Sequence, residues 1–271
     1  MSRPSLPQVE LVVEVGEEHI EQFRRHGFTS VPRITTDEEL EWLDTIYDEL
    51  FEQKRAGVPG GYFDLSRPYD APGEDHLPQA LFPEQVVPEL RETVYYRNAR
   101  AIIARFLGED ESNLLGWGHM ILKPAIHGHE TPWHQDESYW EPTVTYTAAG
   151  AWMPLDETDT DNGCMTFLPG SHRSEVLPHR HISSDPAVHG LELAVEVDTT
   201  GAVPVPLRAG GATFHHPRTI HSTGPNRSPR RRRAYANEFW TEPLPVEDVP
   251  DRPWLHEGRE AWRRRSPEAL A

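Results

Sequence analysis

Hydrophobic residues recur at helical spacing in the first hundred positions of the chain. Three segments fit amphipathic helices: residues 17–26, 37–57 and 88–108. The second has the clearest start, because Thr36 can cap the helix and Glu39 stands at its third position. Its expected buried side carries Leu40, Leu43, Ile46, Tyr47 and Leu50.

Between the second and third helices, residues 57–83 are rich in Pro, Gly and Asp. We predict a long loop here, and long loops in compact domains tend to be lids or binding loops. The loop carries the aromatic residues Tyr62 and Phe63, which we include among the candidate substrate-pocket residues.

The pattern changes after Gly108 to short apolar runs separated by Gly and Pro. We predict strands at residues 114–122, 133–136, 148–155, 165–168, 203–207, 211–215 and 232–240. Helices followed by many strands indicate a mainly β double-sheet barrel or jelly roll, packed against N-terminal helices. We expect one domain over residues 1–271: a helical part at about 17–108, a jelly-roll core at about 112–241, and a tail at 242–271 whose residues 254–265 form a final helix.

Composition narrows the function classes. The 271 residues are 37% hydrophobic, which supports a real core, and the net charge of −18 disfavours nucleic-acid binding, where affinity comes mainly from phosphate neutralisation. The single cysteine, Cys164, excludes an internal disulfide and fits a reducing compartment. No apolar run approaches the ~20 residues that span a bilayer, and the N-terminus lacks a signal-peptide pattern. We expect a cytoplasmic protein, monomeric or homodimeric, with no membrane or nucleic-acid partner.

The strongest chemical signal is His134-Gln135-Asp136, followed much later by His221. Side chains two positions apart on a strand leave the same face, so His134 and Asp136 could reach one metal ion. Two imidazoles and one carboxylate cover one face of an octahedral iron(II) and leave other positions open, as an oxygenase needs. A zinc-binding, non-oxidative β-barrel is the alternative interpretation of the same three residues.

Several histidines compete for the place of the second imidazole. His215 and His216 are adjacent and point to opposite sides if they lie on a strand, while His221 follows a Pro-containing turn. We choose His221 as the ligand. One of His215 and His216 could orient the site from behind the ligands, or simply pack.

Four motifs in a fixed order extend this picture over about half the chain. They read PWHQD at residues 132–136, GAWMPLD at 150–156, NGCMTFLPGSH at 162–172 and HSTGPNRS at 221–228, with an Arg run behind the last. With these motifs the chain resembles the phytanoyl-CoA dioxygenase family of iron(II)/2-oxoglutarate-dependent oxygenases, which includes ectoine hydroxylase-like enzymes. The resemblance implies a cupin-like double-stranded β-helix, with iron held by His134, Asp136 and His221.

The resemblance also implies 2-oxoglutarate and O2 as co-substrates. An Arg eleven positions after the distal His grips the far carboxylate, and here that is Arg232. Arg suits this role because its planar fork matches a carboxylate. Further 2-oxoglutarate contacts implied in the same way are Gln135, Trp152, Thr223 and, more weakly, Lys123.

The Arg run has two competing interpretations. Residues 230–233 could instead form a basic patch that makes the protein a nucleic-acid-binding module, which the acidic balance disfavours. Within the strand, Arg232 and Arg233 lie on opposite faces, so a register slip of one residue would make Arg233 the binder.

The expected activity is hydroxylation of an unactivated C–H bond, with release of succinate and CO2. Related halogenases have a small residue where this chain has Asp136, so halogenation is disfavoured, while desaturation, epimerisation and cyclisation stay open. An acyl-CoA would bring negative charge to an acidic protein, so we prefer a small neutral or cationic metabolite or natural-product intermediate. Its pocket candidates, besides Tyr62 and Phe63, are Tyr139, Trp140, Trp117 and Trp240.

Overall fold

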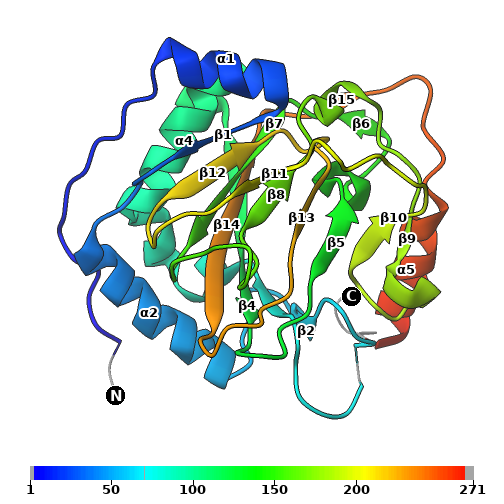
Figure 1. Cartoon of the computed structure of the whole chain (residues 1–271), viewed down its shortest axis with the longest axis horizontal. Helices are drawn as coiled ribbons and strands as arrows, with labels where there is room; N and C mark the ends of the chain where they lie inside the picture. The colour runs from blue at the N-terminus through cyan, green and yellow to red at the C-terminus, as the bar shows by residue number, and fades with distance from the viewer. Residues whose placement is uncertain (1–2, 70, 266–271) are drawn as a thin grey trace.

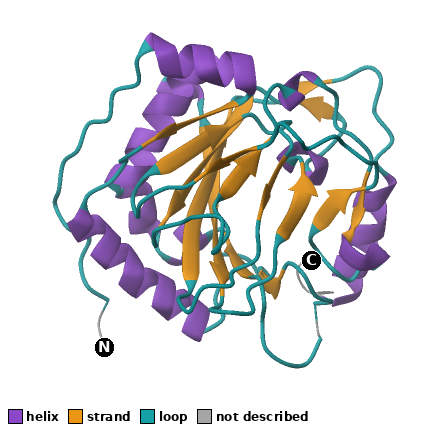
Figure 2. Ribbon diagram, in the orientation of Figure 1, coloured by secondary structure: helices purple, strands orange, loops and turns teal. Residues whose placement is uncertain are grey.

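Two antiparallel β-sheets lie face to face in the computed structural model, which describes residues 3–69 and 71–265 (Figures 1 and 2). The large sheet has the strand order β1-β12-β7-β14-β4-β3-β2, and the small sheet has the order β11-β8-β13-β5. Two strand pairs, β10-β9 and β15-β6, lie beside them. This arrangement confirms the predicted mainly β jelly roll with helices packed on it.

The strands are β1 (Phe28–Val31), β2 (Tyr62–Asp64), β3 (Pro78–Leu81), β4 (Leu115–Lys123), β5 (Thr131–His134), β6 (Val144–Thr145), β7 (Ala148–Pro154), β8 (Met165–Phe167), β9 (His179–His181), β10 (Leu191–Leu193), β11 (Val203–Val205), β12 (Ala212–His215), β13 (His221–Thr223), β14 (Arg232–Trp240) and β15 (Leu244–Pro245). The α-helices are α1 (Glu17–His26), α2 (Asp37–Glu52), α3 (Pro83–Val86), α4 (Val94–Leu107) and α5 (Pro253–Arg265). Short 3-10 turns are η1 (Pro88–Glu92), η2 (Glu111–Asn113), η3 (Asp136–Tyr139), η4 (Ser171–Arg173) and η5 (Ile182–Ser184).

Every strand predicted from the sequence is present to within two residues at each end. Strand β14 begins and ends where we predicted, and it lies in the middle of the large sheet because β4 and β7 pair with its two edges. The strands that were not predicted include β1 and β13, and β13 carries His221.

The helix predicted at residues 88–108 is wrong as a single element. Residues Pro88–Glu92 form a 3-10 turn, and α4 begins only after Thr93. Thr93 has an extended backbone, and its hydroxyl accepts a hydrogen bond from the Tyr96 amide at 3.1 Å. The buried carboxylate of Glu39 accepts two more amides of this first turn, from Val94 and Tyr95. These caps satisfy amides that a new helix start leaves unpaired.

The long loop predicted at residues 57–83 is wrong in part, because residues near its two ends pair as a hairpin, while residues 65–69 and 71–77 lie in the loop between the two strands. Strands β2 and β3 pair with each other, and β3 adds to the edge of the large sheet beside β4. The Asp64 carboxylate stabilises the connection by accepting the backbone amides of Ser66, His76 and Leu77. A Pro- and Gly-rich composition indicated a turn here, but the sheet edge could not be seen from the sequence.

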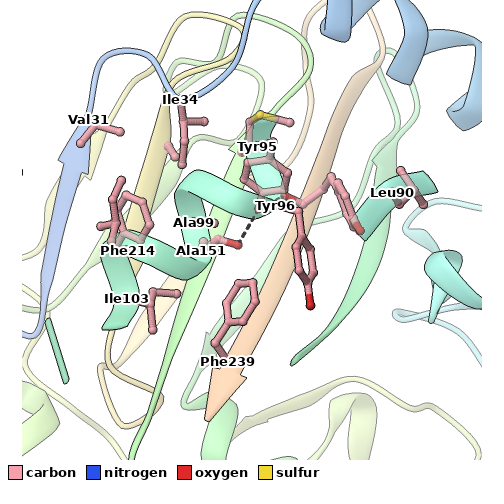
Figure 3. Packing of buried hydrophobic residues seen from close by; sticks show 14 of the residues in the cluster. Val31, Ile34, Leu90, Tyr95, Tyr96, Ala99, Ile103, Ala151, Phe214 and Phe239 are labelled. Atoms are coloured by element: carbon pink, nitrogen blue, oxygen red, sulfur yellow. Dashed lines mark hydrogen bonds between the residues drawn. The ribbon is translucent and has the colours of Figure 1, made fainter. Parts of the chain in front are cut away.

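The main hydrophobic core lies between the helices and one face of the large sheet (Figure 3). Helix α4 packs on β7 and β14, where Tyr95 and Tyr96 contact Tyr235 and Phe239 at ring distances of 5.3 and 5.0 Å. The Tyr95 hydroxyl donates to the backbone oxygen of Ala151 at 3.1 Å, which ties the helix to the middle of the sheet. This face is therefore committed to packing.

The other face of the large sheet looks toward the small sheet, and the candidate site lies between them. The predicted tail at 242–271 contains β15 and α5, and its last residues, 266–271, lie outside the described part of the chain. Helix α5 matches the predicted final helix and is held by Trp254, whose indole N–H donates to the backbone oxygen of Ser138 at 2.9 Å. Among the described residues, no helix is long and apolar enough to cross a membrane.

Candidate active site

His134, Asp136 and His221 converge between the two sheets. His134 ends β5, His221 begins β13, and the two residues face each other in the pairing of these strands. Gln135 has an extended backbone (φ −124°, ψ 132°), so His134 and Asp136 leave the chain on the same side. Asp136 Oδ1 lies 3.5 Å from Nε2 of His134 and 3.5 Å from Nε2 of His221. One ligand atom from each residue can therefore reach a common metal ion.

The backbone fixes which nitrogen each histidine presents. His134 Nδ1 donates to the oxygen of Pro132 at 2.8 Å, and His221 Nδ1 donates to the oxygen of Thr219 at 2.8 Å. Both Nε2 atoms are left to face the centre with a lone pair, as metal-binding histidines need. Burial also lowers the pKa of His221 to about 3, so its imidazole is neutral at physiological pH.

His215 supports the site through Asp136. Its Nε2 donates to Asp136 Oδ2 at 2.8 Å, which leaves Oδ1 for the metal side. Burial acts to raise the pKa of Asp136, but the facing imidazoles of His221, His134 and His215 together hold it well below its usual range. His216 points elsewhere and packs near His172, with ring centroids 5.6 Å apart. Of the two adjacent histidines, the structure thus brings only His215 to the site.

A cavity of about 60 Å³ joins the three ligands to Arg232. Arg232 is only 1% exposed, and its Nε and Nη1 have no hydrogen-bond partner among the described residues. Its guanidinium lies over the Trp152 ring, 5.6 Å from the centroid, and Thr223 lines the same cavity. Burial lowers the pKa of Arg232 to about 10, so the group stays charged at neutral pH. A buried cation with free donors is suited to an anion that enters the cavity.

The register of β14 distinguishes Arg232 from its neighbour. Arg233 lies on the opposite face, where its side chain donates to both oxygens of Asp156 and pairs with Asp44. Only Arg232 faces the cavity, as the alternation within a strand allowed.

Two residues expected near 2-oxoglutarate do not line the cavity. Lys123 is fully buried, but its ammonium donates to the backbone oxygens of Thr223 and Gly224 at 3.1 and 2.6 Å. Gln135 points away from His134, because alternate side chains of an extended segment leave opposite faces. Its amide donates to the backbone oxygens of Glu175 and Arg218 and accepts from the Leu177 amide, so it ties loops together.

A second cavity, of about 280 Å³, opens next to the ligands. Trp117, Tyr139 and Trp140 line it together with His134 and Asp136, and Trp240 lines an adjoining cavity. The remaining two pocket candidates lie elsewhere. Phe63 is buried in a cluster with Leu65 and Leu77, and Tyr62 packs edge-on against Phe51 at 5.6 Å.

The cavity residues missed by the sequence reasoning include Gln79, His119, His189 and Glu238. Glu238 could have been found, because it lies on the predicted strand 232–240 at an even spacing from Arg232 and so shares its face. Gln79 and Leu81 lie on β3, within the segment that we had predicted to be a binding loop. This segment does line the cavity, but as a strand near the edge of the sheet.

Comparison with known proteins decides the family. The family described as phytanoyl-CoA dioxygenase (PhyH) matches residues 23–234, which include all three ligands and Arg232. The chain belongs to this family. The resemblance drawn from the motifs is therefore confirmed.

Among curated relatives, a probable phytanoyl-CoA dioxygenase of Caenorhabditis elegans is 30% identical over 164 residues, which are 56% of this chain and 52% of that protein. A probable alpha-ketoglutarate-dependent hypophosphite dioxygenase of Stutzerimonas stutzeri is 34% identical over 136 residues, or 49% of this chain and 46% of that protein. The chain thus spans about half the length of the curated relatives that it matches.

Solved structures match over more of the chain. EvdO2 from Micromonospora carbonacea var. aurantiaca, complexed with 2-oxoglutarate, has a TM-score of 0.79 at 38% identity and covers 91% of this chain and 99% of that one. The carbocyclase SnoK from nogalamycin biosynthesis has a TM-score of 0.66 at 22% identity, covers 92% of this chain and 90% of that one, and shows the shared fold alone.

Proposed function

We propose that the protein is an iron(II)- and 2-oxoglutarate-dependent dioxygenase that oxidises a C–H bond of a small molecule. One observation carries the proposal: a His/Asp/His donor set and a buried guanidinium with free donors line the same cavity. The similarity to a solved protein complexed with 2-oxoglutarate supports the choice of co-substrate.

The residues present fit both groups. Two imidazoles and a carboxylate suit iron(II), and three protein ligands leave positions open for other molecules. Nε and Nη1 of Arg232 have no hydrogen-bond partner among the described residues, and the far carboxylate of 2-oxoglutarate would supply one. When bound, iron(II) and 2-oxoglutarate activate oxygen and couple the formation of succinate and CO2 to oxidation of the substrate.

The chain's own side chains bind, orient and exclude water. His134 and His221 are held in one tautomer by backbone carbonyls, and His215 orients the Asp136 carboxylate. Arg232 would grip the far carboxylate beside Thr223 and Trp152, which line the same cavity. The buried side chains of Met165 and Phe167 stand behind the ligands and keep water from the reacting centre.

Hydroxylation is the outcome we favour, because Asp136 occupies the place that a halide would need. Desaturation, epimerisation and cyclisation use the same oxidising centre and depend on how the substrate is held. Among the described residues that line the 280 Å³ cavity there is no Lys or Arg, while the Asp136 carboxylate is present. This lining supports a neutral or cationic metabolite or natural-product intermediate over an acyl-CoA. A single domain, a monomer or homodimer, and a cytoplasmic location complete the proposal.

Succinate formation tests the proposal directly. The purified protein is incubated with 2-oxoglutarate, and succinate is measured with iron(II) and air, with iron(II) without oxygen, and with zinc(II) in air. Succinate should form only with iron(II) and oxygen. Equal succinate in the three conditions, or none in any, would contradict the proposed activity and leave a zinc-binding, non-oxidative barrel as the better interpretation.

A further inference from the structure

The inner face of β14 continues past the cavity that holds Arg232. Side chains alternate along the strand, so Arg232, Ala234, Ala236, Glu238 and Trp240 share one face. Six positions of strand advance by about 20 Å, which sets Glu238 well away from Arg232 along the strand. Glu238 lines both the 60 Å³ cavity and the 280 Å³ cavity, so it stands where the two meet.

Glu238 is a buried carboxyl group with one unpaired oxygen. It is 5% exposed, and its Oε2 makes no hydrogen bond to the described residues. One of its oxygens lies within 4.8 Å of ligand atoms of Asp136 and His215, which places it beside the metal site. Buried polar groups in native proteins are normally hydrogen-bonded. An unpaired carboxyl oxygen that faces a cavity therefore indicates that a bound ligand supplies its hydrogen-bond partner.

Gly150 keeps the space in front of Glu238 open. The two residues face each other across the pairing of β7 and β14. A Cβ at position 150 would lie 2.7 Å from Glu238 Oε1 and 3.0 Å from His215 Nε2. Any larger residue would therefore have to displace the Glu238 carboxyl or the His215 ring.

An aromatic cavity of about 310 Å³ lies next along the same strand. It is lined by Trp117, Trp140, Tyr146, Trp240 and Pro243, none of which is charged. Trp117 and Trp140 also line the 280 Å³ cavity, so the two cavities share these walls. Trp117 faces Glu238 in the pairing of β4 and β14, which makes the aromatic wall and the carboxyl group neighbours.

We propose that Glu238 and the aromatic cavity form a substrate-positioning site for a molecule that carries both a hydroxyl or amino group and a ring. Glu238 accepts a hydrogen bond from the hydroxyl or amino group close to the carbon that is oxidised. Trp117, Trp140 and Trp240 hold the ring further out, where flat aromatic faces contact its apolar face. The inference rests on the proposed function for the position of the reacting carbon.

Another cavity, of about 450 Å³, lies along α5 and could compete for the ring. Tyr139 and His189 separate it from the 280 Å³ cavity, with their rings stacked at 5.6 Å and nearly parallel at 14°. The Tyr139 hydroxyl also accepts the Leu191 amide at 2.7 Å, which fixes this wall. The aromatic cavity needs no such wall to move, so it is the better place for the ring.

Binding of three naphthyl probes tests the site. The full chain is loaded with iron(II) and 2-oxoglutarate without oxygen, and fluorescence anisotropy is measured for 2-(2-naphthyl)ethanol, 2-(2-naphthyl)ethylamine and 2-naphthylacetate. The alcohol and the amine should bind at least tenfold more tightly than the acetate. Glu238→Ala should remove that preference. Glu238→Gln, which keeps the shape and an accepting oxygen, should retain binding of the alcohol.

A matched pair of tryptophan variants locates the ring. Trp240→Ala, in the aromatic cavity, should weaken all three probes about tenfold, whereas Trp262→Ala, in the cavity along α5, should leave their binding unchanged. The opposite result would overturn the placement of the ring. Equal binding of acetate and alcohol to the unaltered protein, or no binding of any probe, would overturn the role of Glu238.

The succinate assay separates this inference from the proposed function. A protein that forms succinate with iron(II) and oxygen but lacks the predicted probe preference refutes the positioning site alone. A protein that shows the probe preference but forms no succinate refutes the proposed activity alone.

Discussion

The two faces of β14 differ in what they bury: aromatic rings lie on the outer face, and polar side chains of the candidate site lie on the inner face. On the outer face, Tyr235 and Phe239 pack against Tyr95 and Tyr96 of α4. On the inner face, Arg232 and Glu238 are also buried, yet Nε and Nη1 of Arg232 and Oε2 of Glu238 have no hydrogen-bond partner among the described residues. Burying an unpaired polar or charged group destabilises a fold, whereas burying aromatic rings stabilises it.

This difference separates the side chains that stabilise the fold from those that are placed for binding and catalysis. A β-strand changes face at every residue, so neighbouring positions can serve packing and binding independently. The helices cover the outer face, while the inner face combines polar site residues with a smaller apolar cluster that includes Trp152, Ala234 and Ala236. Changes on the outer face should therefore alter the free energy of unfolding, while changes on the inner face should alter binding and turnover.

The largest effect is expected from removing a metal ligand. His221→Ala should lower iron-dependent succinate formation by more than about 100-fold, because it removes one of three ligands, whereas losing a supporting residue typically costs 10–100-fold. His215→Ala, which keeps all three ligands but frees Asp136, should show that smaller loss in iron affinity. Iron content and succinate are measured for both variants.

The reverse order would identify a different metal site. Asp136, His215 and Glu238 also bring ligand atoms within 4.8 Å of one another. Near-native activity of His221→Ala together with an inactive His215→Ala variant would assign the metal to this second set.

A change on the outer face should instead destabilise the fold. Phe239→Ala removes a fully buried ring that packs against Tyr96, and such changes typically cost about 3–5 kcal/mol of unfolding free energy. Denaturant unfolding measures the loss, and succinate formed per folded molecule should stay close to that of the unaltered protein. A large loss of turnover in protein that is still fully folded would show that the two faces are coupled.

Arg232 and Arg233 allow the comparison to be made between adjacent residues. Arg232→Ala should weaken 2-oxoglutarate binding by about 2–5 kcal/mol, at least roughly thirtyfold, because the buried carboxylate of the co-substrate loses its partner. Metal binding should be largely retained. Arg233→Ala, which breaks the pair with Asp156 on the outer face, should reduce stability and leave the 2-oxoglutarate requirement unchanged. Titration with 2-oxoglutarate at saturating iron(II) distinguishes the two variants.

Local signals explain what could be predicted from the sequence. The alternation within residues 232–240 was enough to place β14, and the spacing of His134 and Asp136 needs only an extended Gln135 to bring both to one side. The order of the motifs then pointed to the family and to His221. These predictions rest on neighbours in the chain, which a sequence displays directly.

Contacts between distant segments explain what could not be predicted. Gln135 was expected at the co-substrate, but its partners, Glu175, Leu177 and Arg218, come from loops far along the chain. The segment around β2 and β3 became a hairpin because the edge of β4 was available to pair with it. The alternation within β14 places Glu238 on the face of Arg232, but the space that Gly150 leaves in front of it comes from pairing with β7, which the sequence does not display.

The smallest expected effect concerns acid stability. His119 lines the inner cavities, its Nδ1 lies 3.1 Å from the side-chain oxygen of Gln79, and burial lowers its pKa to about 4. The unfolded chain takes up the proton near pH 6.5, whereas the folded protein takes it up only near pH 4. The unfolded state thus binds more protons in this window, so the stability that His119 contributes is present above pH 6.5 and is lost as the pH falls toward 4.

His119→Gln should flatten this loss in the metal-free protein. One titrating group changes the slope by at most about 1.4 kcal/mol per pH unit, and the difference should vanish above pH 6.5. Phe239→Ala is the matched control, because an apolar change on the outer face should lower the unfolding free energy by the same amount at every pH. Denaturant unfolding at half-unit steps from pH 4 to 8 measures both curves. If His119→Gln shifts the whole curve without changing its slope, then His119 acts by packing, and the inner face contributes to stability in the same way as the outer one.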